Sequence, residues 1–330
     1  MKKLPISSAG FALLIAGFAE WLDILGYSAG TIQSMPSIVR EFLHYLEASG
    51  CNRIDQLKSE HVRGYHGMIT GRTNERRGGG LSNNYITKHI QTLEKFMQYL
   101  HHRGAQNLPS IAIKPPKVER PPIVVLSKED VAELFKACDP QDGEEKAEAL
   151  RARDRAMLAV FYGCGLRRNE AANVRVDDID LDARTIKVRK GKNYKERLVP
   201  IGKTGAKQLA EWIYDHRPFL LSSLGGDGHG PEEVLFVATG GKAMSGGMLY
   251  HRLKVIQQNT ESAELRSKTI GLHTLRHAIA THLLQAGMEL QKIARFLGHS
   301  SMDSTQIYTH LSAEAEGEGG PIREAHGNVR

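Results

Sequence analysis

A segment late in the chain reads Gly271-Leu272-His273-Thr274-Leu275-Arg276-His277, and the motifs Leu297-Gly298-His299-Ser300 and Thr305-Gln306-Ile307-Tyr308 follow it. Apolar residues recur between these motifs at helical spacing, which predicts two helices with a common buried side formed by Ile279, Leu283, Ile293, Phe296 and Leu297. His273 and Arg276 are three positions apart and therefore share one face of a helix. An imidazole beside a guanidinium suits phosphoryl chemistry without a metal ion, because the guanidinium neutralises charge and the imidazole moves protons or donates a hydrogen bond.

The composition narrows the class of protein. The 330 residues are enough for two ordinary domains, and 41% apolar with 25% charged residues is typical of a soluble globular protein. The net charge of +7 favours a polyanionic partner, although many enzymes share it. Cys51, Cys138 and Cys164 are odd in number and form no Cys-x-x-Cys pair, which indicates reduced thiols in a cytoplasmic protein rather than disulfides or zinc ligands.

Residues 1–107 are expected to form a helical domain. The apolar spacing that begins at Phe11 fits an amphipathic helix better than a signal peptide, and no stretch is apolar for long enough to span a membrane. Thr31 and Ser82 are expected to cap later helices. The loop 71–80 is basic and glycine-rich, and both a contact with DNA phosphates and an ordinary solvated loop stay open for it.

A change of composition marks the end of that domain. Residues 108–126 contain a run of prolines and basic side chains, which predicts an extended, basic linker. Residues 127–312 are expected to form a second domain. The acidic, glycine-rich tail 313–330 is expected to be flexible.

The second domain is predicted to combine helices with a small sheet. Strands are predicted at 185–189 and 197–201, joined by a basic hairpin turn at 190–196, and a short strand is predicted at 234–237. Helices are predicted near 127–138, 149–163, 203–217 and 247–257. Gly163-Cys164-Gly165 breaks the second of these helices just before Arg167.

The chain resembles the tyrosine recombinases, or phage-integrase family, in the motifs Gly165-Leu166-Arg167-x-x-Glu170, His273-x-x-Arg276, Leu297-Gly298-His299 and Tyr308. The run from Gly298 to His310 is similar in detail to the Xer branch. The resemblance implies a mainly α fold with a small β-sheet. An amino-terminal four-helix core-binding domain of the SAM-like type would close on DNA as a clamp, and a mixed α/β domain would carry out catalysis.

In that family a tyrosine hydroxyl attacks a DNA phosphodiester, which leaves a 3′-phosphotyrosyl link and a free 5′-hydroxyl, and no cofactor takes part. The resemblance therefore assigns the catalytic roles to Arg167, Lys192, His273, Arg276, His299 and the nucleophile Tyr308. The two arginines stabilise the charge of the transition state, and the histidines share proton movement and hydrogen bonding to a non-bridging oxygen. Glu170 is the acidic partner of Arg167.

The general acid that protonates the leaving 5′ oxygen is assigned to the hairpin turn. Counting back from Glu196-Arg197-Leu198 selects Lys192, with Lys190 and Lys195 as rivals on the same turn. His273 and His277 are also spaced like the ligands of a zinc protease. Thr274 stands where that motif requires glutamate, so no metal site is expected.

Basic side chains of the first domain and the linker are the candidate DNA contacts, namely Arg72, Arg76, Arg77, Lys88, Lys95, Lys114 and Lys117. The resemblance implies double-stranded DNA with inverted-repeat sites as the partner. A homodimer would bind each site and a homotetramer the synapse, alone or with a second recombinase, in the cytoplasm and without a membrane. Phosphate contacts carry no base sequence, so the DNA site stays open, as does the choice among integration, excision, inversion and dimer resolution.

Three rival interpretations make different predictions. A type IB topoisomerase shares the chemistry but relaxes supercoils as a monomer, a DNA-binding protein on the same fold lacks catalysis, and a generic basic helical protein forms no covalent DNA adduct. The Xer-like motifs argue against the first, and the complete residue set argues against the second.

One departure from the family concerns the segment after Tyr308, where the family continues into a helix that docks on the neighbouring subunit. Gly317, Gly319 and Gly320 are poor residues for such a helix.

Overall fold

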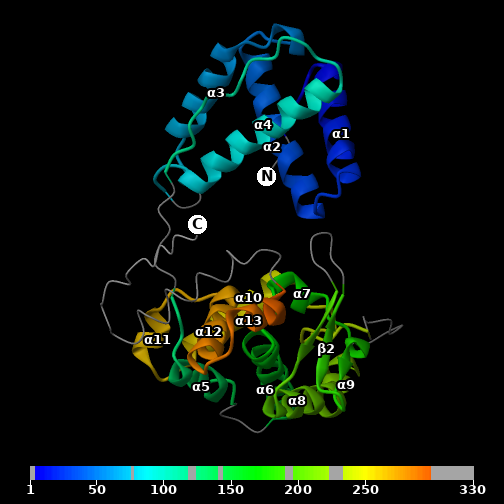
Figure 1. Ribbon diagram of the computed structural model, residues 1–330, viewed down its shortest axis with the longest axis vertical. Helices are drawn as coiled ribbons and strands as arrows, with labels where there is room; N and C mark the ends of the chain where they lie inside the picture. Colours follow the sequence, from blue (N-terminus) through cyan, green and yellow to red (C-terminus); the bar gives the residue numbers. More distant parts are fainter. Residues whose placement is uncertain are drawn as a thin grey trace, which may run out of the picture. The chain divides into compact units, whose positions relative to one another are not determined.

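The computed structural model describes residues 4–75, 78–117, 124–139, 144–189, 196–222 and 233–298. Contacts divide the chain into two compact units, Met1–Pro121 and Pro122–Arg330, and each unit is considered by itself (Figure 1). Within the described ranges, no helix is both long and apolar enough to cross a membrane.

The described part of the first unit is built on the helices α1 (Ala9–Ile24), α2 (Ala29–Ala48), α3 (Ser59–Gly71) and α4 (Asn83–His102), with a short turn of 3-10 helix at Ile54–Gln56. Serine side chains cap three of them, and each hydroxyl accepts from a backbone N–H three residues on. Ser28 caps α2 in place of the predicted Thr31, because Ser28 has extended backbone and its Oγ accepts from the backbone N–H of Thr31.

Aromatic side chains fill the core of the first unit. Phe18 and Phe96 are completely buried and meet edge to face with ring centroids 5.4 Å apart. The beginning of the proline-rich segment packs on the same core through Leu108, Ile111 and Ile113. Asn83 Nδ2 also donates to the carbonyl of Lys117 at 2.9 Å. The described start of the expected linker, residues 108–117, therefore lies on the first unit, and residues 118–123 lie outside the described ranges.

The second unit contains a small antiparallel sheet in the order β1 (Ile179–Asp180), β2 (Thr185–Val188) and β3 (Arg197–Pro200). Ile186 pairs with Val199, and both side chains are buried. Both predicted strands of the hairpin are confirmed, whereas the sequence did not predict β1. The strand predicted at 234–237 was wrong, because that segment makes only isolated bridges, Arg175 with Val234 and Val237 with Ala243.

Helical segments make up most of the rest of the described second unit: α5 (Lys128–Lys136), α6 (Glu145–Leu158), α7 (Arg168–Ala172), α8 (Lys203–Ala210), α9 (Arg217–Ser222), α10 (Gly246–Gln258), α11 (Ala263–Ser267), α12 (Leu272–Gln285) and α13 (Leu290–Leu297). Two π-helical segments interrupt them. η2 (Ala159–Gly163) continues α6, and η4 (Glu211–His216) joins α8 to α9. The predicted fold class, mainly α with a small sheet, is confirmed.

Two glycines allow the end of α13 to approach the turn that follows η2. Gly165 has φ of +60°, and a Cβ there would lie 2.8 Å from Leu297 Cδ2 and 3.2 Å from Phe296 Cε1. Gly298 has φ of +65° and ends α13 in the left-handed conformation that favours glycine. The last carbonyl groups of α13 are thereby placed against the loop that leads into α7.

Gly165→Ala should lower the free energy of unfolding by about 2–5 kcal/mol. The left-handed backbone conformation costs an alanine roughly 1–2 kcal/mol, and overpacking at Leu297 adds about 1–3 kcal/mol. Gly163→Ala is the matched control, because a Cβ there meets no atom within 4 Å. Urea denaturation followed by circular dichroism measures both, and equal losses for the two variants would contradict the close approach of α13.

Candidate active site

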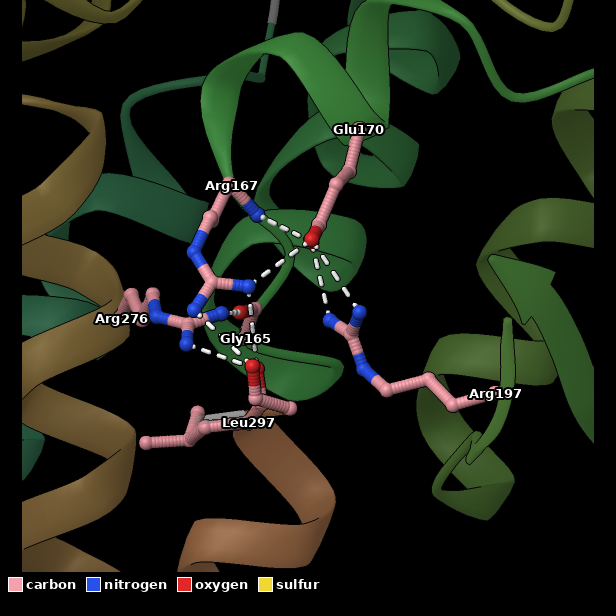
Figure 2. A network of polar contacts seen from close by, with 7 residues as sticks. Gly165, Arg167, Glu170, Arg197, Arg276 and Leu297 are labelled. Carbon is pink, nitrogen blue, oxygen red and sulfur yellow. Dashed lines mark hydrogen bonds and ion pairs between the residues drawn. The ribbon is translucent and has the colours of Figure 1, made fainter. Parts of the chain in front are cut away.

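Arg167 lies at the amino-terminal end of α7, directly after the glycine turn. The carboxylate of Glu170 accepts from the backbone N–H of Arg167 at 2.9 Å and so caps the helix. The same carboxylate accepts from Nη1 of Arg167, also at 2.9 Å. Backbone and side chain of Arg167 are therefore held by one acceptor, which fixes the direction of the guanidinium (Figure 2).

Arg276 reaches the same place from the first turns of α12 and is only 3% exposed. It donates to the carbonyl of Gly165 and, at 2.7 Å, to that of Leu297. Arg167 also donates to Leu297 O, at 3.4 Å, and to Gly298 O at 3.0 Å. Carbonyl groups at the end of a helix have no partner within it and carry partial negative charge, so they are suited to bind both guanidinium groups.

Glu170 also binds a third arginine. Arg197, the first residue of β3, donates from Nη1 and Nη2 to the two carboxylate oxygens at 3.1 and 2.9 Å. Burial disfavours the ionised carboxylate, but the hydrogen bonds from Arg197 and Arg167 outweigh it and lower the pKa of Glu170 to about 2. Glu170 is therefore an anion at any physiological pH, shared between two guanidinium groups.

His273 stands in the first turn of α12, exposed to solvent, within electrostatic reach of this cluster. Partial desolvation lowers the pKa of His273, and the positive charges of Arg276, Arg168 and Arg167 lower it further. The pKa of the neighbouring His277 falls to about 4, chiefly through burial. At neutral pH His273 is thus a neutral imidazole, which can accept a proton.

The other predicted catalytic residues, Lys192, His299 and Tyr308, lie outside the described residues, as do the rivals Lys190 and Lys195. Of the predicted set, the structure brings together Arg167, Glu170 and Arg276 and sets His273 beside them. The described residues include no cluster of histidine, cysteine and carboxylate side chains that could hold a metal ion. A cavity of about 680 Å³ opens elsewhere, between Lys136, Arg151 and Arg252, and none of the predicted catalytic residues lines it.

The candidate DNA contacts of the first unit differ in their surroundings. Lys88, Lys114 and Lys117 are exposed, and Lys95 donates to Gln98 Oε1 at 2.8 Å. Arg72 forms a 2.6 Å ion pair with Glu41, whose side chain is 9% exposed, so its charge is already balanced inside the unit. Arg76 and Arg77 lie outside the described ranges. All of these contacts stay predictions.

Comparison with known proteins identifies the family. Residues 124–315 match the phage integrase family. The tyrosine recombinase XerD of Listeria monocytogenes is 30% identical over 302 residues, which cover 91% of this chain and 94% of that protein. The chain belongs to the phage integrase family, the tyrosine recombinases. XerC of Oceanobacillus iheyensis, another member, is 30% identical over 304 residues, covering 92% of each chain.

Solved structures agree with this recombinase in fold. A XerH site-specific recombinase bound to its difH substrate aligns with a TM-score of 0.69 at 20% identity, covering 95% of this chain and 97% of that one. The integrase of the transposon Tn1549, in complex with transposon right end DNA, aligns with a TM-score of 0.63 at 18% identity over 92% and 98% of the two chains. The predicted family and its enzyme class, site-specific DNA recombination, are confirmed, and none of the three rival interpretations gains support.

The sequence analysis did not identify Arg197 as a candidate site residue of this recombinase. It used Arg197 only as a reference point from which to locate Lys192 on the hairpin turn. The alternation of buried and exposed side chains along β3 is a signal that could have identified Arg197. Val199 is buried and Leu198 is 67% exposed, so Arg197 falls on the inward face of the strand. An arginine on the buried face of a strand requires an anionic partner, and the nearby anion is Glu170.

Glu170→Gln should lower the free energy of unfolding at pH 7 by about 3–5 kcal/mol, because it leaves buried positive charges without their anion. The folded-state pKa of about 2 lies below the ordinary 4.5, so the stabilisation is complete above pH 4.5 and is lost as the pH falls toward 2. The difference between wild type and variant, measured by urea denaturation, should therefore shrink across that interval.

Glu196→Gln provides the matched control, because Glu196 is 53% exposed and pairs with Lys187 at 3.3 Å. An exposed pair of this kind contributes about 0–1 kcal/mol. A Glu170→Gln difference that stayed constant down to about pH 2.5 would show that the carboxylate is not the anion described above.

Proposed function

We propose that this recombinase cuts DNA by attack of the Tyr308 hydroxyl on a phosphodiester, forming a 3′-phosphotyrosyl bond and releasing a 5′-hydroxyl. The observation that carries the proposal is the convergence of Arg167 and Arg276, distant in sequence, on the same carbonyl oxygen of Leu297. Two guanidinium groups fixed side by side can bind the non-bridging oxygens of one phosphate. Each preorganised donor of this kind is typically worth about 3–4 kcal/mol of barrier.

The remaining steps use proton transfers. His273, neutral at physiological pH, takes the proton of the Tyr308 hydroxyl as the oxygen–phosphorus bond forms. Lys192 donates a proton to the 5′ oxygen as its bond to phosphorus breaks. His299 hydrogen-bonds a non-bridging oxygen; it directly follows Gly298, whose carbonyl accepts from Arg167. Attack by a 5′-hydroxyl of another strand reverses these transfers and rejoins the DNA, so no ATP is needed.

The partner we propose is double-stranded DNA with inverted-repeat sites. The relative XerH was solved on its difH substrate and the Tn1549 integrase on transposon end DNA, which supports DNA as the partner of this chain. Residues 1–107 act as the clamp, joined by the linker 108–126 to the catalytic domain 127–312, and Lys88, Lys114 and Lys117 offer exposed positive charge. A dimer of this recombinase binds each site, and a tetramer forms the synapse. The tetramer contains either this chain alone or this chain with a second recombinase, and the protein acts in the cytoplasm. Dimer resolution and movement of a mobile element are both compatible with this chemistry.

Tyr308→Phe should bind the site as tightly as wild type and form no covalent adduct. The substrate is a nicked duplex carrying an inverted repeat from the DNA that flanks the gene, and the adduct is read as a band shift that resists detergent. Tyr250→Phe, at a tyrosine 42% exposed in α10, is the matched control and should retain the adduct. Adduct formation by the Tyr308 variant, or its loss from wild type on addition of EDTA, would count against the proposal.

The cleavage rate of wild type should stay level as the pH falls from about 8 to 6.5 and decline only below that. The neutral form of His273 is the active one, and the pKa of His273 lies below its ordinary 6.5. Single-turnover cleavage of the same nicked duplex across this range gives the profile, and His273→Gln should be slower and lose the acidic decline. An acidic decline centred above 6.5 would contradict this role.

A further inference from the structure

Arg197 directs its hydrogen bonds to Glu170. Both terminal nitrogens of its guanidinium bind the Glu170 carboxylate, and the side chain is only 11% exposed. Its Nε is buried and has no hydrogen-bond partner among the described residues. Figure 2 shows Arg197 approaching the carboxylate from the side opposite Arg276. The hydrogen bonds of Arg197 therefore link it to the site through Glu170.

Glu170 in turn binds Arg167, one of the two arginines proposed to hold the phosphate. A carboxylate beside such an arginine has two opposite effects. It orients the guanidinium by hydrogen bonding, and it also cancels the positive charge that the phosphate needs. A second cation on the same carboxylate removes the harmful effect and keeps the useful one.

The charges of the cluster fit this role. Arg167, Arg197 and Arg276 around the single carboxylate of Glu170 leave a surplus of two positive charges, since Glu170 is fully ionised. Attack of a phenolate on a phosphodiester passes through a transition state with two negative charges. Without Arg197 the surplus would fall to one positive charge. The carboxylate of Glu170 would then be balanced by Arg167 alone, which would leave less positive charge for the phosphate.

We propose that Arg197 is a positioning residue for DNA cleavage: it neutralises and holds the Glu170 carboxylate, so that Glu170 orients Arg167 without weakening the attraction of Arg167 for the scissile phosphate. Gly298 lets the guanidinium fit against the end of α13, because a Cβ there would lie 2.8 Å from Arg197 Cζ. This inference rests on the proposed phosphotyrosyl chemistry.

The test is single-turnover cleavage at saturating DNA by Arg197→Gln, Arg197→Lys, Glu170→Gln and the double variant Arg197→Gln/Glu170→Gln. Arg197→Gln should reduce the cleavage rate constant by about 10- to 100-fold, the scale seen when a catalytic group is displaced by ~1 Å. Its affinity for DNA should stay within about twofold of wild type, and Arg197→Lys should recover most of the rate because it restores the charge. The double variant removes Arg197 together with its anion, so Arg197 is not left as an unpaired buried charge, and this variant should be no slower than Glu170→Gln alone.

Arg189→Gln is the matched control, because Arg189 follows β2 and binds the buried carboxylate of Asp178, at 2.6 Å, instead of the carboxylate of Glu170. It should cleave at a rate close to wild type. An equal loss of cleavage rate for Arg189→Gln would show that Arg197 only stabilises the sheet, and it would overturn the proposal. So would a double variant whose loss is the product of the single losses, because Arg197 would then act independently of Glu170.

A second substrate separates this role from an effect on the leaving group. A 5′-bridging phosphorothiolate releases a thiolate that needs no proton, so it bypasses the general acid. The Arg197→Gln loss should persist on this substrate, and recovery to the wild-type rate would overturn the proposal by placing the defect at the general acid. If wild type itself forms no adduct on either substrate, the phosphotyrosyl chemistry fails and the role of Arg197 fails with it; an active wild type with an undiminished Arg197→Gln rate rejects only the role of Arg197.

Discussion

The proposed active site depends on the contact between two guanidinium groups and the carbonyl end of α13. Arg167 and Arg276 come from different helical segments and meet at Leu297 O, where the helix leaves its last acceptors unsatisfied. Arg276 is almost completely buried, so its charge needs these oxygens to compensate for lost hydration. The same bonds that stabilise the fold therefore hold both cations in place before any phosphate arrives, which is the condition for preorganised catalysis.

Backbone shape makes this contact possible. Gly165 and Gly298 both have positive φ, and each lies where a side chain would collide, with Leu297 in the first case and with Arg197 in the second. The π-helical segment η2 comes just before Gly165 and packs against α12, the helix that carries Arg276. Irregular helical turns of this kind are common at functional sites, and here one places the carbonyl of Gly165 within reach of Arg276.

Much of the fold was predictable because its signals are local. Apolar spacing located α4 and α12, and a glycine pair located the break before Arg167. β1 has two residues, too few for an alternating pattern, and the segment at Val234 has strand composition without a continuous partner. Motif resemblance located Arg167, Glu170 and Arg276, but the pairing of Arg197 with Glu170 spans 27 positions, and sequence alone does not say which distant charges meet.

The choice of arginine follows from the number of bonds required. Five N–H donors in one plane let a single side chain bind backbone carbonyls and a phosphate oxygen together, whereas an ammonium group has three donors and a stronger hold on water. Arg167 already binds Glu170, Leu297 O and Gly298 O, and its charge still has to reach the substrate. A lysine in that position would have to choose between supporting the fold and binding the phosphate. In the mechanism that we propose, the guanidinium of Arg167 does both, because Arg197 balances the carboxylate that orients it.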